Sequence, residues 1–133
     1  MISDKYILLV EDDIDINNAI ESILCEEGYN VSCTFNGQEA LRFLQSAPVK
    51  PALIFLDMMM PVMNGYEFRQ AQLKIPELAK IPTIVLSANG KQEEIRNLGV
   101  RDSLNKPLDL ETLIDTVKLN ISNTPSGTLP RNL

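Results

Sequence analysis

Five polar residues stand where apolar, strand-like stretches of this sequence end. Two follow residues 6–10, one closes residues 53–57, one follows residues 83–86 and one follows residues 103–105: Glu11, Asp12, Asp57, Ser87 and Lys106. If these stretches are parallel strands, their carboxyl ends meet at one edge of a sheet, where open α/β sheets bind ligands. The sequence therefore predicts one cleft that holds three carboxylates, a hydroxyl and an ammonium group.

The five polar groups of such a cleft are suited to one common chemistry. Crowded carboxylates repel one another, and a hard divalent cation relieves the repulsion. Oxygen-only ligands in an exposed cleft suit Mg²⁺, which takes one or two carboxylates together with phosphate oxygens and water. Lys106 adds a positive charge and Ser87 adds a hydroxyl donor. Together these groups suit a phosphoryl group that is transferred in line to a carboxylate oxygen.

Composition excludes several other classes. The chain has 133 residues, a formal net charge of -6 and no histidine. The length fits one domain, and the acidic balance argues against a protein that binds a nucleic-acid backbone. Without histidine, His-based acid–base catalysis and His metal sites are excluded. No apolar run approaches the roughly 18 residues of a membrane span, and Met1 to Lys5 is no signal peptide, so we expect a soluble cytoplasmic protein.

The two cysteines form no recognisable framework. Cys25 and Cys33 have neither the number of a disulfide scaffold nor the spacing of a zinc site. Both lie in otherwise apolar patterns, which predicts two small buried thiols.

Hydrophobic periodicity predicts five strands that alternate with five helices. Continuous or alternating apolar runs indicate the strands, and three- and four-residue spacing indicates the helices. The strands are expected over residues 6–10, 31–35, 53–57, 83–86 and 103–105, and the helices over residues 14–27, 38–45, 65–73, 92–98 and 110–121. Such alternation implies right-handed crossovers and a parallel sheet covered on both faces.

Turn and capping residues mark the ends of several elements. Gly28 is placed to end the first helix, because glycine adopts the left-handed conformation readily. Asn64 can cap the third helix with Glu67 in a capping box, and Asp109 can cap the last helix. Residues 1–122 are predicted to form one domain, and residues 123–133, which have no period, a flexible tail.

These stretches resemble the receiver domain of two-component response regulators, the family of the chemotaxis response regulators. The matching stretches are Ile7–Asp13, Asp57–Gly65, Ile84–Ala88 and Leu104–Pro107. The resemblance implies a flavodoxin-like α/β fold, a five-stranded parallel sheet of order 2-1-3-4-5 with five helices. It also implies a cis Lys106–Pro107 peptide bond.

The resemblance assigns a role to each residue of the cleft. It implies that Asp57 is the phosphoacceptor for a sensor histidine kinase or a phosphotransfer protein, with Ser87 as the switch hydroxyl and Lys106 as the lysine that pairs with the phosphoryl group. Mg²⁺ would be held by Glu11, Asp12, Asp57 and the backbone carbonyl of Met59. The chain would then not be a conventional enzyme, although Mg²⁺-dependent self-phosphorylation and autodephosphorylation at Asp57 are expected.

The sequence departs from the family pattern on the face that the family uses for output. Ser103 stands where the family usually has a tyrosine or phenylalanine, and Leu108 replaces a frequent phenylalanine. The stretch between Ser87 and Lys106 is shorter than usual by roughly one helical turn, so the helix within it should be truncated. We therefore expect a monomer or a weak dimer.

Two other classes compete with this interpretation. A Mg²⁺-dependent aspartyl phosphohydrolase commonly needs a second acid two residues after the nucleophile, where this chain has Met59. A pseudo-receiver would keep the fold as a protein-binding module and ignore phosphate; Ser103 and the short helix favour it, whereas Asp57, Lys106 and the acidic pair oppose it.

No effector domain is expected after Ile121, so the chain is either a stand-alone receiver or a piece of a longer protein that acts on a downstream protein target.

Overall fold

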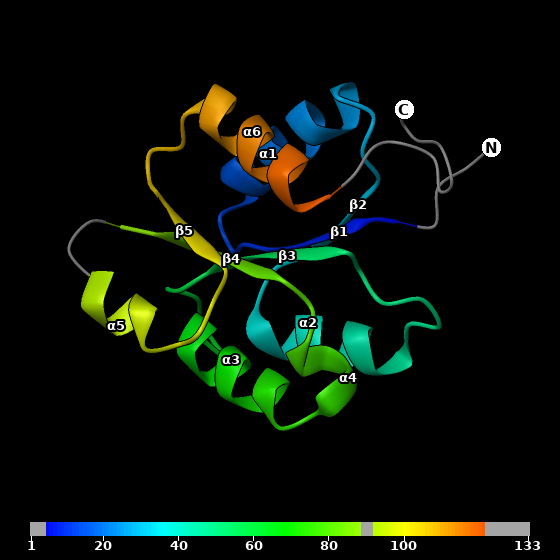
Figure 1. Cartoon of the computed structure of the whole chain (residues 1–133), viewed down its shortest axis with the longest axis vertical. Helices are drawn as coiled ribbons and strands as arrows, with labels where there is room; N and C mark the ends of the chain where they lie inside the picture. Colours follow the sequence, from blue (N-terminus) through cyan, green and yellow to red (C-terminus); the bar gives the residue numbers. More distant parts are fainter. Residues whose placement is uncertain (1–4, 89–91, 122–133) are drawn as a thin grey trace.

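A five-stranded parallel sheet forms the centre of the molecule (Figure 1). The structure is a computed structural model, and it describes residues 5–88 and 92–121. The strands are β1 (Ile7–Val10), β2 (Val31–Thr34), β3 (Leu53–Asp57), β4 (Thr83–Ser87) and β5 (Asp102–Asn105). Their order across the sheet is β2-β1-β3-β4-β5, which confirms the predicted order.

Helices cover both faces of this sheet. They are α1 (Ile14–Glu26), α2 (Gly37–Ser46), α3 (Gly65–Leu73), α4 (Pro76–Ala79), α5 (Gln92–Arg96) and α6 (Leu110–Asn120). In Figure 1, α1 and α6 lie on one side of the sheet, and α2, α3, α4 and α5 lie on the other. No helix of the described residues is long and apolar enough to cross a membrane.

The prediction of five helices is wrong by one short helix. The segment between Pro76 and Pro82 contains α4, which has four residues and carries Pro76 at its start. Proline is tolerated there because the first N–H groups of a helix have no intrahelical partner. One turn is too short to show a hydrophobic period, so periodicity alone missed it.

The core consists of two layers, one on each face of the sheet. Strand β3 is buried along its whole length, and its alternate side chains enter opposite layers. Ile54 and Leu56 pack with Phe68 of α3 and the other helices of that face, whereas Leu53 and Phe55 pack with α1 and α6. This burial on both faces explains why the strand reads as a continuous apolar run.

The capping residues act as predicted. Asn64 and Glu67 form a capping box, with Asn64 Oδ1 accepting from the Glu67 N–H at 2.9 Å and Glu67 Oε1 accepting from the Asn64 N–H at 2.9 Å. Asp109 Oδ2 accepts from the Thr112 N–H at 3.0 Å. Gly28 follows the end of α1 with φ of +94°, the left-handed conformation that glycine tolerates.

The prediction of buried thiols is wrong. Cys25 is exposed and Cys33 is half-buried. The buried stripe of α1 contains Ile20 and Leu24, and Cys25 follows this stripe onto the solvent side. Strand β2 is an edge strand, so Cys33 is only partly covered, although burial still raises the pKa of its thiol to about 11.

Two other expectations concern the second half of the chain. Helix α5 ends at Arg96, two residues before the predicted end, and is only five residues long. The tail expected over residues 123–133 lies outside the described residues.

Candidate functional site

The parallel register brings the predicted site residues to one edge of the sheet. Asp57 and Ser87 are the last residues of β3 and β4, and they pair with Leu86 and Asn105 of the neighbouring strands. Glu11 and Asp12 directly follow β1, and Lys106 directly follows β5. The carboxyl ends of four strands therefore place five polar side chains in one small region.

Three carboxylates form the centre of this site. One oxygen from each of Glu11, Asp12 and Asp57 lies within 4.8 Å of the other two. Glu11 is 0% and Asp57 3% exposed, whereas Asp12 is partly exposed. An oxygen-only cluster that opens to solvent on one side fits a hard cation such as Mg²⁺, which keeps part of its water shell.

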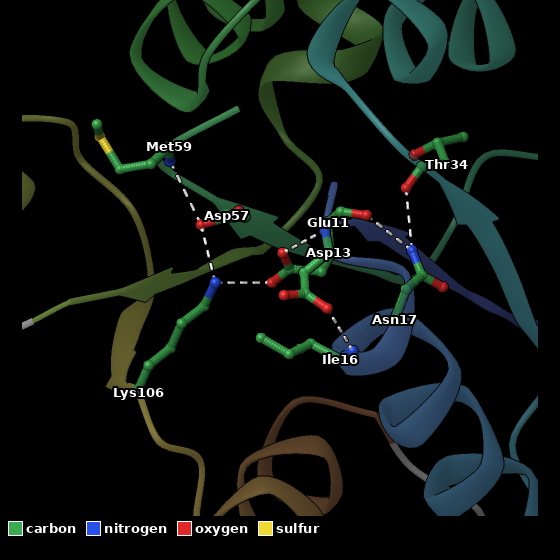
Figure 2. Close-up of polar contacts among 8 residues, drawn as sticks. All are labelled: Glu11, Asp13, Ile16, Asn17, Thr34, Asp57, Met59 and Lys106. Carbon is green, nitrogen blue, oxygen red and sulfur yellow. Dashed lines mark hydrogen bonds and ion pairs between the residues drawn. The ribbon is translucent and has the colours of Figure 1, made fainter. Parts of the chain in front are cut away.

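Lys106 joins two of these acids. Its Nζ lies 2.9 Å from Glu11 Oε1 and 3.2 Å from Asp57 Oδ1 (Figure 2). The bond to Asp57 has hydrogen-bond geometry, whereas the contact to Glu11 is an ion pair without good alignment. Burial opposes the charge of Lys106, but the contacts with Glu11 and Asp57 outweigh it and raise the pKa of its ammonium group.

For Asp57 and Asp12, in contrast, the surroundings disfavour the ionised form and raise the pKa. Burial raises the pKa of Asp57, and the neighbouring Glu11 raises it further; Lys106 opposes this only in part. The pKa of Asp12 is raised by partial burial and by Asp57. One lysine therefore does not neutralise the cluster, and a divalent cation would lower its free energy.

Ser87 and Met59 complete the site. The hydroxyl of Ser87 is buried without a hydrogen-bond partner among the described residues, a costly arrangement unless a ligand supplies one. The backbone N–H of Met59 donates to Asp57 Oδ1 at 3.3 Å, so the main chain of Met59 borders the acid (Figure 2). Its side chain is 71% exposed.

A second group of residues, which the sequence analysis missed, holds the acidic pair in place. The side-chain amide of Asn17 donates to the carbonyl oxygens of Glu11 at 3.0 Å and Thr34 at 3.2 Å. The backbone N–H of Asp13 donates to Glu11 Oε2 at 3.1 Å (Figure 2). A signal for Asn17 was available, because Asn17, Ile20 and Leu24 form the buried stripe of α1 and Asn17 is its one polar member.

The loop between β3 and α3 is tightly shaped around the site. A Cβ atom on Gly65 would lie 2.6 Å from the carbonyl oxygen of Asp57, so only glycine permits this approach. Val62 has φ of +70°, a strained conformation for a β-branched residue. The Lys106–Pro107 peptide bond is cis, as the resemblance implied.

Comparison with known proteins agrees with this geometry. The family described as the response regulator receiver domain matches residues 7–118. The probable transcriptional regulator ycf29 of Porphyra purpurea is 38% identical over 115 residues, which cover 84% of this chain and 54% of that protein. The chain thus spans about half the length of this curated relative, and of several others that it matches.

Solved structures share the fold. The chemotaxis protein CheY4 of Vibrio cholerae matches with a TM-score of 0.80 and 30% identity, covering 90% of this chain and 100% of that one. The response regulator TrrA of Thermotoga maritima, solved in complex with Mg²⁺ and BeF, matches with a TM-score of 0.78 and 27% identity over 88% of this chain and 99% of that one. The chain belongs to the receiver-domain family of two-component response regulators.

Proposed function

We propose that Asp57 accepts a phosphoryl group from a sensor histidine kinase or a phosphotransfer protein. Receiver domains interact with proteins of these two kinds, and they are not conventional enzymes. The observation that carries the proposal is the contact of Lys106 Nζ with both Asp57 and Glu11, beside the unpartnered hydroxyl of Ser87. These groups offer one nucleophilic oxygen and two donors at the same edge.

The transfer step forms one bond and breaks one. An oxygen of the Asp57 carboxylate attacks the phosphorus of a phosphohistidine, the new O–P bond forms, and the P–N bond breaks. The imidazole nitrogen keeps the electron pair of that bond and takes up a proton. Because Asp57 is the nucleophile itself, no base is needed to remove a proton from it once it is ionised.

Glu11, Asp12 and Asp57, together with the backbone carbonyl of Met59, would hold Mg²⁺. The fit rests on the three carboxylate oxygens within 4.8 Å of one another and on the raised pKa of Asp57 and Asp12. When bound, the ion would neutralise charge on the transferring phosphoryl oxygens.

Lys106 and Ser87 would bind the phosphoryl group once it is on Asp57. Lys106 then exchanges part of its contact with the acids for a phosphoryl oxygen, a charge-assisted hydrogen bond. The Ser87 hydroxyl donates to a second oxygen and gains the partner that it lacks. This new contact is the differential interaction that would shift the protein toward a signalling conformation recognised by a downstream protein.

The proposal extends to the fate of the phosphoryl group and to the domain boundaries. We expect Mg²⁺-dependent self-phosphorylation from small donors and autodephosphorylation at Asp57, because the acidic cluster opens to solvent on the side of Asp12. Residues 1–122 would form the receiver, with residues 123–133 as a tail. We expect neither direct nucleic-acid binding nor membrane association of this domain.

Intact-mass measurement after incubation with acetyl phosphate and Mg²⁺ tests the proposal. The protein should gain the mass of one phosphoryl group, and Asp57→Asn should gain none. Asp13→Asn is a matched control because Asp13 is a nearby exposed acid that caps α1 through the Ile16 N–H, and asparagine caps equally well. This control should be labelled like the parent.

Two results would overturn the assignment. Equal labelling of Asp57→Asn would place the phosphoryl group elsewhere, and no labelling of the parent, even by a set of histidine kinases, would favour the pseudo-receiver. Steady turnover of a small phosphate ester would instead favour the phosphohydrolase.

A further inference from the structure

A buried arginine outside the acidic cluster has no carboxylate partner among the described residues. Arg69 of α3 is 5% exposed, and no ion pair of its guanidinium exists within the described residues. Its Nε donates to the Leu98 carbonyl at 3.0 Å, and its Nη2 donates to the Gly99 carbonyl at 3.0 Å. Its Nη1 donates to Gln72 Oε1 at 2.8 Å and, more weakly, to Thr83 Oγ1 at 3.4 Å.

These contacts solvate the guanidinium but do not neutralise it. Neutral oxygens accept four of its five N–H groups: two backbone carbonyls, the Gln72 side-chain amide and, at longer distance, the Thr83 hydroxyl. One N–H of Nη2 therefore has no acceptor in the part of the chain that the structure describes. Desolvation lowers the pKa of this group, and no acid opposes the shift. A buried charge without a counter-ion is costly, which is why most are paired.

The same arginine lines a cavity of about 380 Å³. Two more cationic residues line it, Lys80 and Arg101, and none of its lining residues is acidic. The ammonium group of Lys80 makes no hydrogen bond or ion pair with the other described residues, whereas Arg101 Nη1 donates to Asn120 Oδ1 at 2.9 Å. In a protein with a formal net charge of -6, three cations around one cavity form a local site of positive potential.

The cavity belongs to the edge of the sheet opposite the phosphorylation site. Thr83, which lines it, begins β4, and Ser87 of the phosphorylation site ends the same strand. The two residues stand about 13 Å apart along a strand of this length. An anion in the cavity would therefore be separate from the phosphoryl group on Asp57.

We propose that this cavity binds a small oxyanion, a phosphate or carboxylate group, between the guanidinium of Arg69 and the cationic side chains of Lys80 and Arg101. Arg69 supplies a planar donor that is fixed in place by Leu98 and Gly99, so little side-chain entropy is lost on binding. Lys80 and Arg101 supply the remaining charge. The proposal does not depend on phosphorylation of Asp57.

Amide chemical shifts provide a direct test. Inorganic phosphate or succinate is titrated against chloride at constant ionic strength, and the amides of Gly99, Val100 and Arg101 are followed separately from that of Lys106. We expect saturable shifts at residues 99–101. Response to phosphate alone or to succinate alone identifies which oxyanion the site prefers, and either supports the proposal.

Charge variants distinguish specific anion binding in the cavity from unspecific attraction of anions to the protein surface. The double variant Lys80→Gln, Arg101→Gln should raise the anion concentration at which the shifts of residues 99–101 are half-saturated. We expect an increase of roughly tenfold or more, about the contribution of one charge-assisted contact. Lys74→Gln with Arg96→Gln removes the same charge from exposed positions outside the cavity and should leave the midpoint unchanged. Arg69→Met would remove four buried hydrogen bonds and is expected to destabilise the fold, so these surface variants carry the test.

Three outcomes would overturn the proposal. Shifts that do not saturate would mean an adventitious ion only. An equal loss of anion affinity in both double variants would mean unspecific screening. The third outcome is no shift at residues 99–101 with either anion. Each would leave Arg69 as a purely structural clamp between α3 and the residues that follow α5.

Discussion

Replacing Asp57 with asparagine should stabilise the protein when Mg²⁺ is absent. The nearly isosteric change removes one negative charge from a buried cluster of three carboxylates. It also removes the attraction of Lys106, so the sign of the effect depends on which contribution is larger. The raised pKa of Asp57 indicates that burial and repulsion by Glu11 exceed the attraction.

Coulomb's law gives the size of the effect. At 4.8 Å or less and an effective dielectric constant of about 20, each carboxylate pair repels by at least about 3.5 kcal/mol. The attraction between Lys106 and Asp57 at 3.2 Å is about 5 kcal/mol on the same scale. Two repulsions exceed one attraction by about 2 kcal/mol. We expect the free energy of unfolding of Asp57→Asn to rise by 1 to 2 kcal/mol, in round numbers.

Mg²⁺ should make the parent more stable than Asp57→Asn. The parent gains about 1.4 kcal/mol when the free ion is at about ten times its dissociation constant, and about 2.7 kcal/mol at a hundred times. The variant lacks one of the carboxylates that would hold the ion and should gain much less. With rising Mg²⁺ the two unfolding free energies therefore approach each other and then cross.

Urea denaturation at neutral pH, with and without MgCl₂, measures both effects. Asp13→Asn serves as the control for an acid lost next to the cluster, and it should change neither value by more than a few tenths of a kcal/mol, as expected for an equivalent cap. If Asp57→Asn is less stable than the parent without Mg²⁺, Lys106 dominates the cluster and the reasoning is wrong.

The free energy of unfolding of the Mg²⁺-free protein should fall as pH rises through the titration of the acidic cluster. Folding raises the pKa of Asp57 and Asp12, so between their unfolded and folded pKa values the folded state binds more protons than the unfolded state. This contribution makes the Mg²⁺-free protein less stable as pH rises through the folded values. Protons and Mg²⁺ compete for the same oxygens, so the Mg²⁺-dependent gain should shrink as pH falls through that window.

Three further predictions concern the loop around the site and the output face. Val62→Gly should raise the unfolding free energy by roughly 0.5 to 1 kcal/mol in urea titrations, because it relieves a left-handed valine whose side chain is largely exposed; a loss would show that the conformational freedom that glycine adds to the unfolded chain outweighs the relieved strain. Gly65→Ala should cost about 2 kcal/mol or more, because its Cβ would meet the Asp57 carbonyl, whereas Gly28→Ala meets no atom within 4 Å and should show only the strain of its positive φ. Beryllofluoride with Mg²⁺ should not convert the protein to a dimer in sedimentation experiments, because Ser103, half-buried in β5, offers no aromatic ring to bury; a clean dimer through α5, β5 and α6 would contradict this.

The sequence predicts the arrangement of the site well because strand ends are easy to recognise. Each of the five strands is a short apolar or alternating run that stops at a polar residue, and the parallel register then places Glu11, Asp57, Ser87 and Lys106 at one edge. Capping residues such as Asn64 and Asp109 have local chemistry, so their contacts also follow from the sequence.

Features that depend on three-dimensional burial were not predictable in the same way. Asn17 holds the backbone of Glu11 from within the apolar stripe of α1, and Arg69 interacts with carbonyl groups 29 and 30 residues away. Helix α4 is a single turn with no period of its own. Cys25 was misplaced because an apolar pattern gives the orientation of a helix only to within about one residue.

The helices on the two faces of the sheet differ in length, and this difference determines where the domain unfolds locally. The face with α1 and α6 is covered by helices of 13 and 11 residues, whereas the other face combines α2 and α3, of 10 and 9 residues, with α4 and α5, of only 4 and 5 residues. Helices this short are not stable by themselves and depend on their contacts with the sheet. Their amide protons should therefore exchange with solvent through local openings of low free energy, while those of β3, buried on both faces, exchange only when the whole domain unfolds. The conformational freedom of the domain is thus concentrated on one face, which includes α5.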